Sequence, residues 1–374
     1  MKDLPRLFLP VMLTVSSLAV AATFVALPDA TPVQAATASD DSGTMKRASA
    51  DMRKVLMKLD ELNPKPLGSV EAPEARKQPT PADAVAALLK SEGKDPEKMK
   101  QEMGVTTEDT TYTSAGTQIP ARIYKPAGAD AKALPIIFYI HGGGWVIADL
   151  DTYDATPRAL AKKANAIVVS VHYRQAPENK FPASHDDTFE AYKWALDKAQ
   201  SWGADPKKMA IVGESAGGNM AMTVSMAARD NKIQLPTHIV AVYPVASTLT
   251  DSPSYQKNEN AKPLSKAGMK WFFKNETAKA EDLRDPRLDL VKSADLSKLP
   301  ATTIITAEID PLKSDGEMLA ERLKAAGVKT AIKNYEGVTH EFFGMDAVVK
   351  SAGEAQDFAV QELKKGWSKP TAQN

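Results

Sequence analysis

The sequence predicts an α/β fold in which a mostly parallel central sheet is flanked by helices on both faces. From residue 110 onward, short apolar runs alternate with helical segments, and the run 135–140 is apolar along its whole length. Strands of that kind are buried on both faces, and helical crossovers connect parallel neighbours. With 374 residues, of which 43% are hydrophobic, the chain can form one large α/β domain with an added subdomain.

The predicted strands and helices follow a regular order within a main domain that spans 110–374. The first two strands, 112–113 and 119–124, are expected to form an antiparallel pair. Further strands are predicted at 135–140, 166–171, 209–212, 238–243, 302–307 and 330–335. Helices are predicted at 152–163, 186–200, 216–229, 314–326 and 352–365.

The interval 247–299 breaks this alternation. It is polar and rich in proline, and it lies between two core strands. We therefore expect an insertion that folds over the carboxyl edge of the sheet as a helical cap. An apolar and aromatic cluster lies within it, at Met269, Trp271, Phe272 and Phe273. Two roles are open for this cluster: it anchors the insertion to the core, or it lines a substrate pocket.

Residues 36–109 are predicted to form an N-terminal cap segment and linker, because they precede the first convincing strands. Apolar residues recur at steps of three and four over 45–62, which predicts an amphipathic helix. A proline-rich connection follows at 63–81, and a short helix is predicted at 82–90. The first helix is expected to pack against the main domain, because its pattern is too short to favour a coiled coil.

The first 35 residues have the features of an export signal. Lys2 and Arg6 precede an uncharged run at 7–27, and small residues follow at 33–35. This pattern predicts a signal peptide, with an uncleaved N-terminal membrane anchor as the alternative. No Lys or Arg occurs between Arg6 and Lys46, so the charge pattern sends the rest of the chain across the membrane in either case. We expect an exported protein, periplasmic or secreted, or anchored to the outer face of the inner membrane.

Charge balance and cysteine content exclude several classes of function. Lys plus Arg and Asp plus Glu each number 47, so no net field would recruit nucleic acid or an anionic membrane surface. An electrically neutral small molecule is the expected substrate. The chain has no cysteine, which excludes disulfides, thiol catalysis and cysteine zinc sites.

A candidate nucleophile lies in the segment Gly213-Glu214-Ser215-Ala216-Gly217, between an apolar strand and a helix rich in Ala and Met. This is the pattern of a nucleophile elbow, in which the two glycines permit a tight strand-to-helix turn and the serine hydroxyl stands above the sheet. Because such a pentapeptide alone is weak evidence, its meaning depends on partners elsewhere in the chain.

Serine needs a base to accept its proton and an acid to orient that base. Among five histidines, His340 lies in a loop after the last predicted strand, where it could reach Ser215. The acid is expected after the preceding strand, and Asp310 is favoured over Glu308 because it lies past the strand end, beside Pro311. His238 is expected to be structural, and His172 and His185 are expected to form local hydrogen bonds.

Backbone donors for a developing oxyanion are predicted in the segment His141-Gly142-Gly143-Gly144-Trp145, which follows an apolar strand. Consecutive glycines let bare N–H groups approach a ligand closely. The predicted donors are Gly143, Gly144 and Ala216, the residue after the nucleophile. A phosphate-binding loop is the competing interpretation, but the Gly-Lys-Ser/Thr ending is absent.

Together these motifs resemble the hormone-sensitive-lipase-like family of α/β-hydrolases, the bacterial family IV esterases. The matching blocks span 110–365 in the family's order, and they include Tyr173-Arg174-Gln175-Ala176-Pro177-Glu178 and His340-Glu341-Phe342. The resemblance implies hydrolysis of short to medium acyl esters without a cofactor or metal. It also implies a helical cap and the order Ser215, Asp310, His340. Many members have Asp where this chain has Glu214, and this difference concerns packing beside the elbow.

Two alternatives use the same scaffold. An amidase or peptidase would use the same groups, since acyl transfer to water from amides and esters shares its machinery. A small-molecule receptor is the other alternative. Plant gibberellin receptors resemble this family but lack its histidine, so the presence of His340 argues against that function.

Overall fold

The computed structural model describes Met1 and residues 42–128 and 133–368. The predicted export signal at 1–35 therefore lies outside the described residues, Met1 excepted. Within the described ranges, no helix has both the length and the apolar character needed to span a bilayer.

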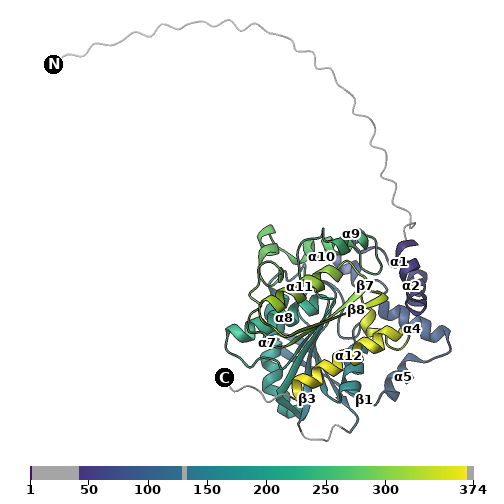
Figure 1. Cartoon of the computed structure of the whole chain (residues 1–374), viewed down its shortest axis with the longest axis horizontal. Helices are drawn as coiled ribbons and strands as arrows, with labels where there is room; N and C mark the ends of the chain where they lie inside the picture. The colour runs from purple at the N-terminus through teal and green to yellow at the C-terminus, as the bar shows by residue number, and fades with distance from the viewer. Residues whose placement is uncertain (2–41, 129–132, 369–374) are drawn as a thin grey trace. The chain divides into compact units, whose positions relative to one another are not determined.

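A single eight-stranded sheet forms the centre of the molecule (Figure 1). Its strands are β1 Val105–Ser114, β2 Thr117–Pro126, β3 Leu134–Ile140, β4 Ile167–Val171, β5 Ala204–Glu214, β6 Ile239–Val242, β7 Thr302–Ile309 and β8 Thr330–Thr339. The spatial order is β1-β2-β4-β3-β5-β6-β7-β8, in which β1, β2 and β4 pair antiparallel and the remaining neighbours pair parallel. The predicted mostly parallel sheet is thus confirmed. The first strand begins earlier than predicted, because the threonine-rich, largely exposed start of β1 lacks an apolar pattern.

Helices cover both faces of this sheet. The long ones in the main domain are α6 Ala155–Ala164, α7 Ala183–Lys198, α8 Ala216–Asp230, α11 Lys313–Ala325 and α12 Lys350–Trp367. Alternate residues of β3 show the two layers. Ile136, Phe138 and Ile140 join the core with α7, α8 and α11, whereas Ile137 and Tyr139 join the core with α6 and α12. Short 3-10 helices follow α7 and β8, at Ala199–Trp202 (η2) and Phe342–Gly344 (η4).

The N-terminal segment packs against the main domain. It contains α1 Ser42–Arg47, α2 Ala50–Leu62, η1 Leu67–Ser69, α3 Ala72–Ala75, α4 Pro81–Ser91 and α5 Pro96–Glu102. The prediction of one continuous helix over 45–62 was wrong, because Ser49 caps α2 by accepting a hydrogen bond from the Met52 amide and so separates it from α1. The apolar stripe of α2 packs against α4 and belongs to the same core as α12.

The insertion between β6 and β7 carries α9 Pro253–Lys257, α10 Lys266–Glu276 and η3 Ala280–Arg284. Its aromatic cluster anchors it, since Met269, Trp271, Phe272 and Phe273 are all buried and belong to the core shared with α7 and α8. The insertion also contacts the N-terminal segment. The Trp271 indole N–H donates to the Val70 carbonyl at 2.9 Å, and α10 packs against η1.

Two methionines in α2 test whether this helix is part of the folded core. Met52 is fully buried, whereas 52% of Met57 is exposed. We expect Met52→Ala to lower the free energy of unfolding by about 2–4 kcal/mol through the cavity it leaves. The matched change Met57→Ala should alter it by less than about 0.5 kcal/mol. Urea denaturation of both variants measures the difference, and equal effects would show that α2 is not packed as described.

Candidate active site

Ser215 lies on a tight turn between β5 and α8. Its φ of +56° is left-handed, a strained conformation for a residue with a side chain. The glycines on either side permit the turn. A Cβ atom on Gly213 would lie 2.1 Å from the carbonyl oxygen of Gly217, and one on Gly217 would lie 2.1 Å from the carbonyl oxygen of Ile140. The predicted reason for both glycines, close approach of backbone, is therefore visible in the fold.

Two hydrogen bonds join Ser215, His340 and Asp310. The His340 ring lies with Nε2 2.9 Å from the Ser215 hydroxyl oxygen and Nδ1 2.7 Å from Oδ2 of Asp310. An ionised carboxylate can only accept, so Nδ1 carries the proton and Nε2 accepts the Ser215 hydroxyl. All three residues are buried, with at most 4% of their surface exposed. The three side chains selected from sequence thus lie together, although 125 positions separate the serine from the histidine.

The electrostatic surroundings of His340 favour its protonated form. Burial alone would lower its pKa, because it penalises the charged ring. The carboxylates of Asp310, Glu341 and Glu214 outweigh this penalty, so the pKa of His340 is raised above its ordinary value. The ring also packs on Tyr243, with centroids 4.4 Å apart.

Hydrogen bonds from distant segments fix the loop that carries Asp310. Its Oδ1 accepts from the Leu312 amide at 2.8 Å, and its carbonyl accepts from the Asn258 side chain at 2.8 Å. Asn258, which follows α9, is bound in turn by Arg47 of α1 at 2.6 Å. Glu308, the carboxylate rejected from sequence, points elsewhere: it accepts from the Gly337 amide at 2.9 Å.

The glycine segment 142–144 lies directly beside the elbow. A Cβ atom on Gly142 would lie 3.1 Å from Cβ of Ser215. Gly143 and Gly144 have φ values of +91° and +56°, and a Cβ on Gly144 would overlap the ring of Phe272 from α10. Within the described residues, the amides of Gly143, Gly144 and Ala216 donate to no protein acceptor. These three predicted donors are therefore available to a ligand.

Aromatic rings support this segment from behind. The Tyr173 hydroxyl donates to the Gly142 carbonyl at 2.8 Å, and its ring stacks on His141 with centroids 4.5 Å apart. Burial lowers the pKa of His141 to about 3, so this ring stays neutral.

His141 Nε2 lies 3.0 Å from Nδ1 of His172. We expected a local hydrogen bond for His172, and this was wrong. The bond between His141 and His172 joins two different loops, which follow β3 and β4. His185 likewise bonds Asn219 of α8 at 3.0 Å, while His238 bonds Thr303 of β7 at 2.9 Å.

Comparison with known proteins agrees with this geometry. The profile of the family described as the alpha/beta hydrolase fold matches residues 137–344. An ethyl acetate hydrolase of Pseudomonas putida is 32% identical over 302 residues, which cover 80% of this chain and 92% of that protein. A carboxylesterase of Mycobacterium tuberculosis is 36% identical over 280 residues, covering 73% and 86% of the two chains.

The chain belongs to the α/β-hydrolase family. Solved structures of esterases are also similar: one from Pyrobaculum calidifontis has a TM-score of 0.71 at 33% identity, covering 83% of this chain and 97% of that one. A thermostable esterase from Pseudomonas putida has a TM-score of 0.75 at 26% identity, covering 87% and 99%. The resemblance to the hormone-sensitive-lipase-like branch, predicted from the motifs, is confirmed.

In this α/β-hydrolase, the glutamate before the nucleophile occupies a fully buried site. Glu214 accepts hydrogen bonds from the hydroxyls of Tyr139, at 2.5 Å, and Tyr243. Burial, and then the nearby carboxylate of Glu341, raise the pKa of Glu214 to about 7. The difference at position 214 was expected to concern packing beside the elbow. The Glu214 carboxylate lies there and, through its two hydrogen bonds, connects strand β3 to the end of β6.

Sequence reasoning missed Arg76, which follows α3. Its guanidinium donates to the carbonyls of Val146 and Ala176 at 2.8 and 2.7 Å, and it forms an ion pair with Glu178 at 2.6 Å. Arg76 thereby holds the segment after the glycines against the segment after Tyr173. No local motif marks this residue, because its partners are 70 to 102 positions away.

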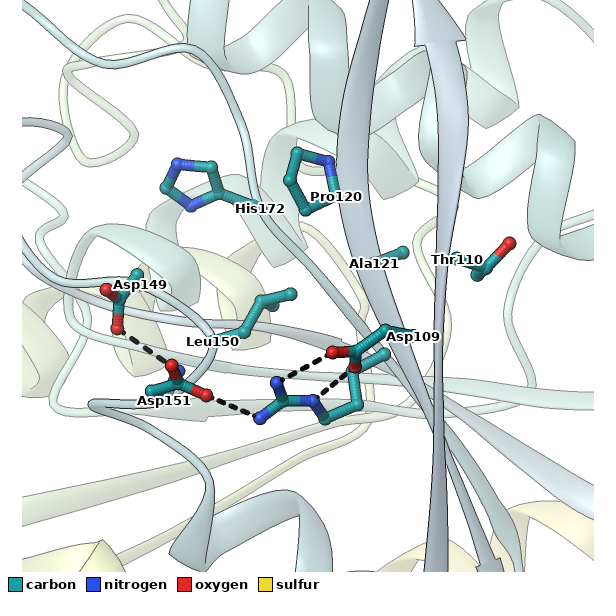
Figure 2. A pocket seen from close by; sticks show the side chains of 9 residues that line it. Asp109, Thr110, Pro120, Ala121, Asp149, Leu150, Asp151 and His172 are labelled. Atoms are coloured by element: carbon teal, nitrogen blue, oxygen red, sulfur yellow. Dashed lines mark hydrogen bonds and ion pairs between the residues drawn. The ribbon is translucent and has the colours of Figure 1, made fainter.

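A hollow of about 310 Å³ lies next to His172 and is lined by residues of β1 and β2 and by the segment 149–151 (Figure 2). Its charged groups pair with one another: Arg122 binds Asp109 at 2.6 Å and Asp151 at 2.7 Å, while Asp149 accepts from the Asp151 amide. None of Ser215, Asp310 and His340 lines it. We therefore regard this hollow as a structural feature apart from the candidate active site.

The raised pKa of Glu214 has a measurable consequence for stability. A carboxyl group whose pKa is higher in the folded state stabilises the fold when protonated, and this contribution is lost as pH rises from 4.5 to about 7. Relative to Glu214→Gln, the wild type should therefore lose about 2–3 kcal/mol of unfolding free energy between pH 5 and pH 8. Urea denaturation at both pH values measures this difference, and a difference independent of pH would contradict the assignment.

Proposed function

We propose that this α/β-hydrolase is a carboxylic ester hydrolase that forms an acyl-enzyme on Ser215. The continuous hydrogen-bonded series from Ser215 through His340 to Asp310 carries this proposal. The names of similar proteins, which include an ethyl acetate hydrolase and a carboxylesterase, support it. Esters with short to medium acyl chains are the proposed substrates.

In the first half of the reaction, Nε2 of His340 takes the hydroxyl proton as the Ser215 oxygen attacks the ester carbonyl. The negative charge that develops on the carbonyl oxygen would be stabilised by the amides of Gly143, Gly144 and Ala216. The imidazolium then gives its proton to the leaving alcohol, and Asp310 stabilises the positive ring without taking a proton itself.

In the second half, His340 removes a proton from water, whose oxygen attacks the acyl carbon. The tetrahedral intermediate collapses, the Ser215 oxygen regains its proton from His340, and the carboxylic acid product leaves and loses its remaining proton to water. The raised pKa of His340 suits both steps, because a stronger base accepts the proton more readily from serine and from water.

The described part of the predicted N-terminal cap segment 36–109, together with the insertion 247–299, is proposed to form the cap over this site. Two contacts support this arrangement. Trp271 of α10 bonds Val70 of the N-terminal segment, and the ring of Phe272 lies against Gly144. Phe272 would then limit the space above the oxyanion donors.

Replacing the nucleophile tests the proposal. Ser215→Ala should lower the turnover of a p-nitrophenyl ester by at least about 10⁴-fold, because nucleophilic catalysis is lost, while the unfolding free energy changes little. The wild type should also react with a fluorophosphonate probe and the variant should not. An inert Ser215 would favour a receptor, and faster cleavage of a matched amide than of its ester would favour an amidase.

We also propose that the protein is exported through the N-terminal signal, with the periplasm or the medium as its destination. The uncharged run 7–27 after two basic residues supports this proposal. When the full chain is expressed in a Gram-negative host, the protein should be found outside the cytoplasm. Its N-terminus should then lie close to residue 36. Deletion of residues 2–35 should keep it in the cytoplasm. Membrane-bound protein with an intact N-terminus would instead indicate the anchor.

A further inference from the structure

A second carboxylate lies beside Nε2 of His340, the nitrogen that accepts the serine proton in the proposed reaction. Oε1 of Glu341 is 3.8 Å from Nε2 of His340, the same atom that bonds the Ser215 hydroxyl. Asp310 lies at the opposite ring nitrogen, so the imidazole has a carboxylate on each side. Reaction chemistry requires only the carboxylate of Asp310, and Glu341 therefore needs its own explanation.

Neighbouring groups hold Glu341 in this place. The Tyr153 hydroxyl donates to Oε1 at 2.6 Å, and the same hydroxyl lies against Gly142 of the glycine segment, 2.3 Å from where a Cβ atom would be. Glu341 thus lies between the glycine segment and the histidine. Its side chain is 23% exposed, whereas that of His340 is 4% exposed. The Glu341 side chain is therefore partly exposed, whereas the His340 ring beside it is buried.

The backbone at Glu341 is in an unfavourable conformation for a residue with a side chain. Its φ of +71° lies in the left-handed region, where glycine is favoured. A side chain in this conformation costs about 1 kcal/mol or more, and such outliers cluster at functional sites.

The reacting ester must approach this carboxylate. The leaving alcohol oxygen receives its proton from Nε2 of His340 and so lies about 3 Å from that atom during the reaction. Because Oε1 of Glu341 is 3.8 Å from the same nitrogen, the two oxygens can be at most about 7 Å apart. A charge on the alcohol part, a few bonds from the ester oxygen, lies within range of unscreened Coulomb interaction.

We propose that Glu341 selects substrates by charge: it favours esters whose alcohol part is cationic or neutral and disfavours anionic esters. The proposal rests on the ester hydrolase function proposed above. The same charge repels the carboxylate product, which is the only new anion that the reaction forms. Tyr153 fixes the direction of the selecting carboxylate and stays neutral, because burial raises its pKa well above the ordinary value.

The test compares three acetate esters of similar size at pH 8. They are acetylcholine, its uncharged isostere 3,3-dimethylbutyl acetate, and the anionic 2-sulfoethyl acetate. Wild-type kcat/KM should fall in that order. Glu341→Gln should reduce the ratio of kcat/KM for acetylcholine to that for 2-sulfoethyl acetate by about tenfold, since it removes the charge and keeps the shape. Glu341→Asp retains the charge, so its ratio of kcat/KM for acetylcholine to that for 2-sulfoethyl acetate should lie between those of the wild type and Glu341→Gln.

Two further measurements separate charge selection from a structural role. With the uncharged ester, the acid limb of the kcat/KM profile should move to lower pH in Glu341→Gln, because a negative charge beside the imidazolium is lost. The matched control Glu308→Gln removes a carboxylate that bonds Gly337 and not His340, and it should keep the wild-type ratio.

The outcomes distinguish this proposal from the one on which it depends. An unchanged ester ratio and an unmoved acid limb in Glu341→Gln would overturn charge selection while leaving ester hydrolysis intact. A wild type that cleaves none of the three esters and resists the fluorophosphonate probe would overturn the ester hydrolase function itself.

Discussion

The structure depends on one close approach of backbone to backbone, where the first turn of α8 meets the end of β3. The contact between Gly217 and the Ile140 carbonyl leaves no space for a side chain, and Ser215 at the same turn has a left-handed φ of +56°. Neighbouring strands hold the strain in place. The Ser215 amide donates to the Val242 carbonyl at 2.9 Å, and the Ser215 carbonyl accepts from the Val245 amide at 3.2 Å. A flexible turn could not keep the hydroxyl at one position above the sheet.

Three loops must then converge on that fixed point, and segments distant in sequence determine where they lie. Arg47 and Arg76 both come from the N-terminal segment. The first reaches the Asp310 loop through Asn258, and the second joins the glycine loop to the loop after β4. The N-terminal segment consequently supplies two arginines that position loops at the candidate site: Arg76 donates to backbone carbonyls of two loops, and Arg47 donates to the Asn258 side chain that binds the Asp310 carbonyl.

Sequence alone predicted the elements whose information is local. Apolar runs located the strands, and the Gly-x-Ser-x-Gly segment located the nucleophile, since the glycine requirement is set within five residues. Asp310 and His340 followed from their places after successive strands. Arg76, Asn258 and Tyr153 could not be found in this way, because each works through partners far away in the chain and none has a distinctive spacing. The break between α1 and α2 escaped prediction because the apolar stripe continues through Ala48.

Three carboxylates around one imidazole give the candidate site its electrostatic character. Burying Glu214 and Glu341 costs free energy, and the raised pKa of each reflects that cost. Among the described residues, neither glutamate forms an ion pair with an arginine or lysine that would offset this cost. Tyrosine hydroxyls donate hydrogen bonds to both carboxylates. The neutral imidazole of the resting state gains little from these negative charges, whereas the imidazolium gains a great deal. When the pH lies above the pKa of His340, the imidazolium forms as the acyl group is transferred, so this arrangement stabilises the reacting state more than the ground state, which is the condition for accelerating a reaction.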